Sequence, residues 1–213
     1  MSDAFVYSIK YDLGFAPNPF GGLCSVACCK PMLREQASVG DWVVGFTAMN
    51  LRPVRGCVFA MIVSRILTFD EYWNEPEFRS RRPARNGSVM KMVGDNIYHH
   101  VKGNWRQEDS VHSLEDGSQC DDNTAHDTRI DKVLLSDRFV YFGDAAPDVP
   151  EHILDGLGYE RVRNYRRYTA GDAADLVSWL EPQIAANPNK VLGDPFNFEA
   201  SGLRYSHAGQ RMI

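Results

Sequence analysis

The spacing of apolar residues along the chain predicts many short strands and one long helix. Short apolar or alternating runs are typical of strands, and they occupy residues 4–11, 23–30, 42–46, 57–67, 97–102, 133–135 and 139–143. Residues 159–168 mix tyrosine with arginine and are interpreted as strand or extended chain. Near the C-terminal end, apolar residues recur at i, i+3, i+4 and i+7 between Thr169 and Ala186, which predicts a helix.

The segment 40–73 contains the strongest of these signals. Two apolar runs joined by a basic loop predict a pair of neighbouring strands. Thr68 and Glu71 have capping-box spacing, which predicts a short helix that carries Tyr72 and Trp73. Such a pair of strands, with aromatic rings near its ends, is expected to build a small β-barrel with an aromatic-lined mouth. The competing interpretation is that these rings are core residues.

One loop and two polar segments interrupt the pattern. The loop, residues 12–22, holds Phe15 and Phe20, and rings in such a loop either pack on the core or line a site. Residues 74–89 are rich in arginine and proline, and residues 106–128 are polar throughout. Long irregular segments inside a compact domain usually have a function, so we expect the segment 106–128 to form a lid or a site.

The order of elements favours a single α+β domain. We find no internal repeat and no clean linker, so residues 1–198 are taken as one domain and residues 199–213 as a flexible C-terminal tail. The strands are many and the helices short until the last one. We therefore expect a mixed or antiparallel sheet curled into a barrel, with short peripheral helices and a C-terminal helix.

Composition and charge narrow the functional classes. The chain has 213 residues, of which 44% are hydrophobic and 24% charged, as in ordinary soluble proteins. No apolar run spans a bilayer and the N-terminus does not resemble a signal peptide, so no membrane partner and a cytoplasmic location are expected. A net charge of −5 argues against a protein that coats nucleic acid through bulk electrostatics.

The cysteines predict neither disulfides nor a metal site. There are five, and three of them, Cys24, Cys28 and Cys29, lie close together in the sequence. If residues 23–30 form a strand, Cys24 and Cys28 are about 13 Å apart and Cys29 faces the other side. Buried small hydrophobes are therefore preferred over zinc ligands. No cofactor is expected, because Gly21-Gly22 is followed by a strand and by no Lys-Ser/Thr pair.

Arginines form two clusters on this acidic chain. The first cluster comprises Arg79, Arg81, Arg82 and Arg85, and the second comprises Arg161, Arg163, Arg166 and Arg167. Either cluster alone is explained by a solvent-exposed surface of the protein. The planar guanidinium of arginine, however, suits phosphates and base edges better than the ammonium of lysine does. The first cluster is therefore a candidate phosphate-binding site.

Seven sequence motifs, in order, resemble a known family. They are FAPNPFGG (15–22), CCKP (28–31), GDWVVG (40–45), LTFDEYW (67–73), GDNIYH (94–99), AHDT (125–128) and FVYFG (139–143). These motifs resemble the second nucleotide-modification-associated domain family, a group linked to DNA base modification in bacteria and phages. The resemblance covers residues from about 4 to about 196. The motif GDWVVG, followed by a long apolar strand, also resembles PUA-like barrels such as the EVE, ASCH and YTH domains.

These resemblances imply that the ligand is DNA or a nucleotide carrying a modified base. In the PUA-like relatives a flipped base sits in an aromatic cage, which implies that Trp42 and Phe46 lie near the floor of a pocket. The first hypothesis is therefore a base-binding module linked to DNA modification or phage defence. The candidate base-binding residues are Asn18, Phe20, Trp42, Phe46, Tyr72, Trp73, Asn96, Tyr98 and Trp105.

Two alternatives stay open. The second hypothesis is an enzyme that acts on a modified base or nucleotide by acid–base or metal chemistry. Its candidate catalytic residues are Asp95, His99, His112, His126 and Asp127. Their spacing matches no metal motif, and the sequence contains no recognisable nucleophile elbow. The third hypothesis is a scaffold that binds protein partners from the same operon.

Overall fold

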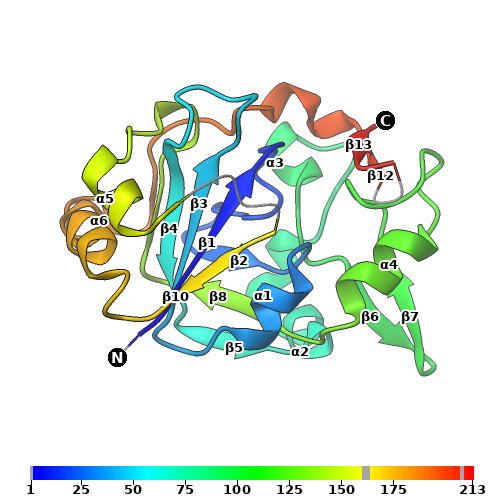
Figure 1. The fold of residues 1–213 in the computed structure, drawn as a ribbon. Coiled ribbons are helices and arrows are strands. Elements are labelled where there is room, and N and C mark those ends of the chain that lie inside the picture. Colours follow the sequence, from blue (N-terminus) through cyan, green and yellow to red (C-terminus); the bar gives the residue numbers. More distant parts are fainter. Residues whose placement is uncertain (1, 160–163, 207–208) are drawn as a thin grey trace.

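The computed structural model describes residues 2–159, 164–206 and 209–213. Its centre is a mixed six-stranded sheet (Figure 1). Across the sheet, the strands are β10 (Arg166–Tyr168), β1 (Ala4–Ile9), β3 (Trp42–Thr47), β4 (Cys57–Ile62), β9 (Phe139–Tyr141) and β11 (Lys190–Val191). The neighbours β1 and β3 run parallel, as do β9 and β11, and the other neighbouring pairs are antiparallel.

The four central strands, β1, β3, β4 and β9, are buried on both faces, which explains why they are apolar on both sides. Ala4 and Val6 of β1 pack with helices α5 (Glu151–Gly156) and α6 (Ala174–Ala186) on one face (Figure 1). Phe5 and Tyr7 point to the opposite face. There they meet a second sheet made of β2 (Cys24–Val26), β8 (Val133–Ser136) and β5 (Arg65–Leu67).

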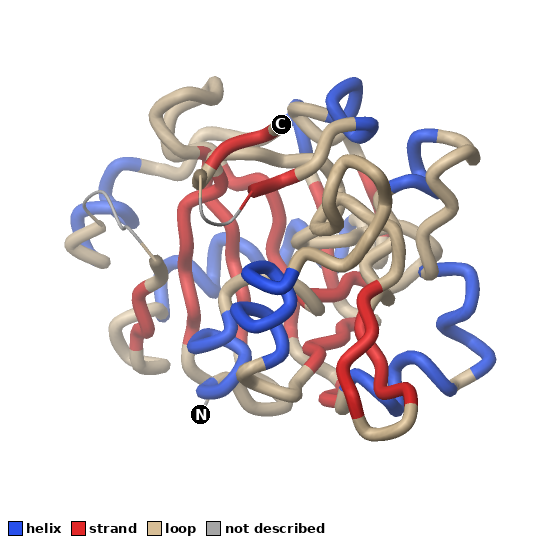
Figure 2. The backbone as a smooth tube through the Cα atoms, turned by 90° about the vertical axis from the view of Figure 1, so that its right-hand side faces the viewer, coloured by secondary structure: helices blue, strands red, loops and turns tan. Residues whose placement is uncertain are grey.

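The rest of the chain packs beside the second sheet. Its elements are α1 (Pro31–Gln36), α2 (Phe69–Asn74), η1 (Pro76–Arg81), α3 (Val89–Met92), β6 (Tyr98–Val101), β7 (Asn104–Gln107), α4 (Asp121–Thr128) and η3 (Phe198–Gly202). The short helix η2 (Gly143–Ala145) instead contacts β4 of the large sheet. The strands β6 and β7 form a separate antiparallel hairpin at the edge of the molecule (Figure 2). No helix among the described residues is both long and apolar enough to cross a bilayer.

The α+β class is confirmed, but the barrel is not found. Within the described residues the edge strands β10 and β11 do not pair with each other, so the six-stranded sheet is open. The predicted strand 57–67 is divided, because β4 pairs with β9 in the large sheet and β5 pairs with β8 in the small one. The capping box is confirmed: the Glu71 amide donates to Thr68 Oγ1, and the Thr68 amide donates to Glu71 Oε2.

The predicted tail folds back onto the body of the protein. Two short strands, β12 (Tyr205–Ser206) and β13 (Arg211–Met212), pair with each other near the C-terminal end of the described chain. The Tyr205 amide donates to the Val111 carbonyl at 2.7 Å, which holds β12 against the loop 108–120. The flexibility of residues 199–213 stays a prediction.

A buried carboxyl, Asp12, joins the loop after β1 to a segment near the C-terminal end. Tyr141 Oη donates to it at 2.7 Å, and the Phe196 amide donates at 3.2 Å. Burial raises the pKa of Asp12 from 3.8 to about 6, and these hydrogen bonds only partly offset that effect. Asp12 therefore binds its proton more tightly in the folded protein than in the unfolded chain.

This shift predicts a pH-dependent difference between the wild type and Asp12→Asn. A raised carboxyl pKa gives stability that is fully present below pH 3.8 and is lost as the pH rises through about 6. From pH 4 to pH 7 we expect the free energy of unfolding of the wild type to fall by up to about 3 kcal/mol relative to Asp12→Asn. Urea denaturation at several pH values measures this difference. A constant difference would contradict it, and Asp148→Asn, at an exposed carboxyl, is the control.

Candidate active site

A sharp turn between β2 and α1 presents Cys29. The strand ends at Val26 and the helix begins at Pro31, and between them Cys29 and Lys30 have φ of 60° and 43°. Residues with a Cβ atom rarely adopt this left-handed conformation, and it concentrates at functional sites. The turn thus resembles the strained strand-to-helix turn that exposes a nucleophile in other enzymes.

The turn is held in place by Arg34, whose side chain is fully buried. Its guanidinium donates to the carbonyls of Cys29 at 3.0 Å and Ile130 at 2.9 Å. It also donates to the carbonyls of Lys132 and Asp127. Arg34 therefore joins the Cys29 turn to the C-terminal end of α4, where helix carbonyls lack partners of their own.

Asp127 of α4 is the centre of a buried polar cluster. Its carboxylate is 0% exposed and accepts hydrogen bonds from the Cys29 amide at 2.8 Å and from Tyr98 Oη at 3.0 Å. Two imidazoles also contact it, His112 Nδ1 at 2.7 Å and His126 Nδ1 at 3.1 Å. A single carboxylate thus orients both histidines and the backbone of the cysteine turn.

The charges within this cluster follow from its geometry. Burial disfavours a charged His112, but the interactions with Asp127 and Cys29 together outweigh burial and raise the pKa of His112 to about 10. Burial likewise disfavours a charged Asp127, but His112, His126 and Arg34 together outweigh burial and hold the pKa of Asp127 far below its usual range. At neutral pH the two groups form an imidazolium–carboxylate pair.

The imidazolium faces the sulfur of Cys29. His112 Nε2 lies 3.7 Å from Cys29 Sγ, on the side of the ring opposite to the Asp127 contact. This contact places a ring nitrogen that can carry a proton beside the Cys29 thiol. Cysteine, histidine and aspartate thus stand in the order nucleophile, proton carrier and orienting group. Cys29 is partly exposed, whereas Cys24, Cys28 and Cys57 are buried.

A metal could approach three groups of the same cluster. Ligand atoms of Cys28, His112 and Asp127 all lie within 4.8 Å of one another. Burial, however, raises the pKa of the Cys28 thiol well above its usual value, and a metal needs the thiolate. His112 Nδ1 is also already committed to Asp127. The donor set therefore suits proton transfer better than metal binding.

The cluster opens into a cavity of about 520 Å³ beyond the C-terminal end of β1. Cys29, His112 and His126 all reach its wall. The remaining described lining residues are Tyr7, Ser8, Ile9, Lys10, Tyr11, Leu13, Phe15, Ala16, Lys30, Pro31, Met32, Val111, Arg129, Asn164, Tyr165, Tyr205 and Met212. A space of this size holds a ligand as large as a mononucleotide.

Comparison with known proteins gives the family. The family model described as nucleotide modification associated domain 2 matches residues 1–202. The chain belongs to this family. No curated protein and no solved structure matched the chain. The family-matched region contains the whole Cys29–His112–Asp127 cluster, whereas the cavity residues Tyr205 and Met212 follow it in the sequence.

The structure groups only some of the candidate catalytic residues of this family member. His112, His126 and Asp127 meet at the cavity, as described above. Asp95 lies in another buried network, where it accepts hydrogen bonds from Tyr72 Oη at 2.9 Å and from Ser25 Oγ. His99 is on the β6–β7 hairpin, 3.8 Å from Glu108.

Two of the candidate base-binding residues lie in the hydrophobic core and do not line the cavity. Trp42 and Phe46 face α5 and α6 and are 4% and 0% exposed. They therefore cannot form the floor of this cavity. The physical reason is that β3 is a central strand of a sheet whose two faces are both covered.

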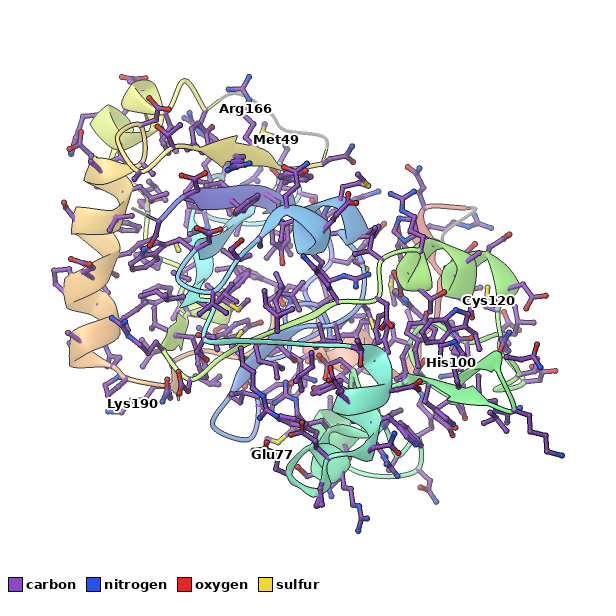
Figure 3. All side chains as sticks on the ribbon, turned by 90° about the horizontal axis from the view of Figure 1, so that it is seen from below. Met49, Glu77, His100, Cys120, Arg166 and Lys190 are labelled. Carbon is purple, nitrogen blue, oxygen red and sulfur yellow. The ribbon has the colours of Figure 1, made fainter. Side chains whose placement is uncertain are left out.

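The other candidate rings are engaged with neighbours. Tyr72 and Tyr98 are fully buried, and Phe20 stacks on Phe198 at 5.6 Å. Trp105 lies 3.8 Å from the His100 ring and packs on Phe69 (Figure 3 labels His100).

Both faces of the Trp73 ring are covered. His99 lies 3.9 Å from the ring centroid and Arg82 lies 3.5 Å from it. Two groups this close to one centroid cannot share a face, so the indole has no face left for a base. The amides of Asn18 and Asn96 also have partners, since they donate to the carbonyls of Val93 and Tyr72.

Most of the candidate phosphate-binding arginines serve the fold. Arg81 is buried and donates to the carbonyls of Phe20, Leu23 and Asn18. Arg82 donates to the Trp73 carbonyl, and Arg85 donates to four carbonyls, including that of Ser201. Arg79 is exposed.

The second arginine cluster is only partly described. Arg161 and Arg163 lie outside the described residues. Arg166 donates to the Gly158 carbonyl at 2.6 Å, and Arg167 pairs with Asp3 at 2.7 Å. These contacts hold β10 to its neighbours.

The sequence analysis does not identify Cys29 as a catalytic candidate, because it predicts a strand that continues through Lys30, whereas β2 ends at Val26. Proline is favoured at the first position of a helix, and Pro31 occupies that position in α1. A predicted strand that stops before Cys28 would place Cys29 in a turn between a strand and a helix. That signal was present in the motif CCKP.

Proposed function

We propose that this chain is a thiol-dependent enzyme that acts on a nucleotide base as part of a DNA-modification system. The observation that carries the proposal is the alignment of Cys29, His112 and Asp127 at the wall of the cavity. In this reading Cys29 is the nucleophile, His112 moves the proton and Asp127 holds His112 charged and oriented. The family description supports nucleotide chemistry as the setting.

The covalent step is part of the proposal and uses the deprotonated form of Cys29, with the charged His112 beside it. The Cys29 thiolate forms an S–C bond with an electron-poor sp² carbon of the base. The π electron pair of that carbon moves to the neighbouring atom, and His112 gives that atom its Nε2 proton. The products are a neutral His112 and a covalent adduct, and the reverse elimination restores the thiolate–imidazolium pair.

The base-binding module with an aromatic cage has less support than the enzyme. Trp42, Phe46, Trp73 and Trp105 contact other residues and do not line the cavity. The thiol site, by contrast, combines a strained turn, a charged histidine and access to a cavity. A role in phage defence and partners from the same operon stay predictions.

Thiol reactivity tests the proposal without knowledge of the substrate. Cys29 and Cys120 are the two partly exposed cysteines, and Cys120, labelled in Figure 3, is the residue just before α4. At pH 7 we expect iodoacetamide to alkylate Cys29 at least about tenfold faster than Cys120, because a cation faces Cys29. Peptide mass spectrometry measures both rates in one sample.

A variant separates the electrostatic cause from exposure. His112→Gln removes the cation, so the alkylation rate of Cys29 is expected to fall about tenfold while that of Cys120 stays constant. Circular dichroism checks that the variant is folded. Equal rates for the two cysteines in the wild-type protein would refute the proposed nucleophile, whether or not the variant folds.

A further inference from the structure

The wall of the cavity has the opposite charge to the protein as a whole. The chain carries a net charge of −5, yet no aspartate or glutamate is among the described residues that line the cavity. Three basic side chains do line it, Lys10, Lys30 and Arg129. In the described part of the chain none of the three forms an ion pair with a carboxylate. The cavity therefore suits an anionic ligand.

Lys30 is the most informative of these cations. It follows Cys29 in the strained turn, and its side chain is only partly exposed. Burial lowers its pKa, and its ammonium lies 5.2 Å from the centroid of the Tyr7 ring. An ammonium removed from water without a carboxylate partner is costly, and a bound anion would offset that cost. Lys10 and Arg129 are exposed at the same cavity.

Aromatic rings form much of the remaining wall. Tyr11, Phe15, Tyr165 and Tyr205 all line the cavity, and Phe15 and Tyr205 also pack on His112, with centroid distances of 4.8 and 5.8 Å. Flat rings beside the catalytic histidine suit a planar heterocycle. The wall thus combines surfaces for a base with cations for a phosphate.

We infer that the cavity binds one phosphorylated nucleotide unit, with its base on the aromatic wall beside Cys29 and its phosphate on Lys30, Lys10 and Arg129. This inference rests on the proposed function, because it names the substrate class of the same site. The unit is supplied either by a free mononucleotide or by a nucleotide within a single strand. The phosphate site differs from the Arg79–Arg85 cluster predicted from the sequence.

The test is calorimetric titration of the Cys29→Ala variant, which removes the chemistry and keeps the cations. The probes are dCMP, dTMP, the matching nucleosides and a five-nucleotide single strand. We expect each mononucleotide to bind at least about tenfold more tightly than its nucleoside, since charge-assisted contacts to phosphate supply the difference. Lys30→Gln and Arg129→Gln should each weaken mononucleotide binding by about tenfold, and Arg79→Gln, at an exposed arginine, should leave it unchanged.

The outcomes separate this inference from the proposed function. Equal affinity for nucleotide and nucleoside, or no effect of Lys30→Gln, would overturn the phosphate site, even if Cys29 is rapidly alkylated. Strong nucleotide binding together with an unreactive Cys29 would support the phosphate site and would show that Cys29 is not the nucleophile. Tighter binding of the strand than of the mononucleotides would identify the strand as the source of the unit, and the converse would identify the free nucleotide.

Discussion

Replacing Asp127 by alanine is expected to lower the free energy of unfolding by about 3–5 kcal/mol. The substitution leaves a buried His112 without its counter-ion and removes the acceptor of the Cys29 amide and of Tyr98 Oη. Urea denaturation at pH 7 measures the loss. Asp122→Ala is the matched control, because Asp122 is on the same helix but exposed, and its loss should stay below about 1 kcal/mol.

The pH dependence of this difference follows from the two shifted groups. Asp127 has a lowered pKa, so its contribution is present above its ordinary value of 3.8 and is lost as the pH falls further. His112 has a raised pKa, so its contribution is fully present below 6.5 and is lost as the pH rises through about 10. The difference between the wild type and Asp127→Ala should therefore be largest between pH 4 and 6.5. A difference that grows above pH 9 would contradict the ion pair.

Replacing Asp95 by alanine is expected to cost a similar amount, about 3–5 kcal/mol. Asp95 is 0% exposed and lies 3.5 Å from the buried guanidinium of Arg81, which would keep its charge without a counter-ion. The hydroxyl of Tyr72 would also lose its acceptor. Guanidinium chloride denaturation measures the loss, with the exposed Asp137→Ala as a control expected within about 0.5 kcal/mol of the wild type.

A second substitution tests whether the cost comes from the unpaired charge. Combining Asp95→Ala with Arg81→Leu removes both charges, so the double variant should be less destabilised than the sum of the two single variants. Additive losses would show that the two side chains stabilise the protein independently of each other.

The strands could be predicted because they form short apolar or alternating runs, but α4 could not. The helix α4 buries Asn123, Thr124 and Asp127, so its inward face is polar and shows no apolar period. Its buried groups are satisfied by hydrogen bonds to other loops, such as the bond from Asn123 Nδ2 to the His112 carbonyl. The polar composition of the segment 106–128 marks it as unusual, yet its local pattern does not reveal such long-range partners.

Of the candidate site, only the two histidines and Asp127 could be predicted from the sequence. His112, His126 and Asp127 were chosen by residue type, and the fold brings them together. The core position of Trp42 and Phe46 could not be predicted, because the continuous apolar run along β3 shows that both faces are buried but not what covers each face. Cys29 depended on a left-handed backbone that local composition does not encode.

The position of the last described strands has a practical consequence for handling the protein. Met212 and Tyr205, which pair in β12 and β13, line the same cavity as His112, and Figure 1 shows these two strands close to the C-terminal end of the chain. Any polypeptide joined after Ile213, whether natural or an affinity tag, begins next to that cavity. A purification handle placed there could obstruct soaking or kinetic work, whereas one at the N-terminus would emerge at the opposite end of the molecule (Figure 1).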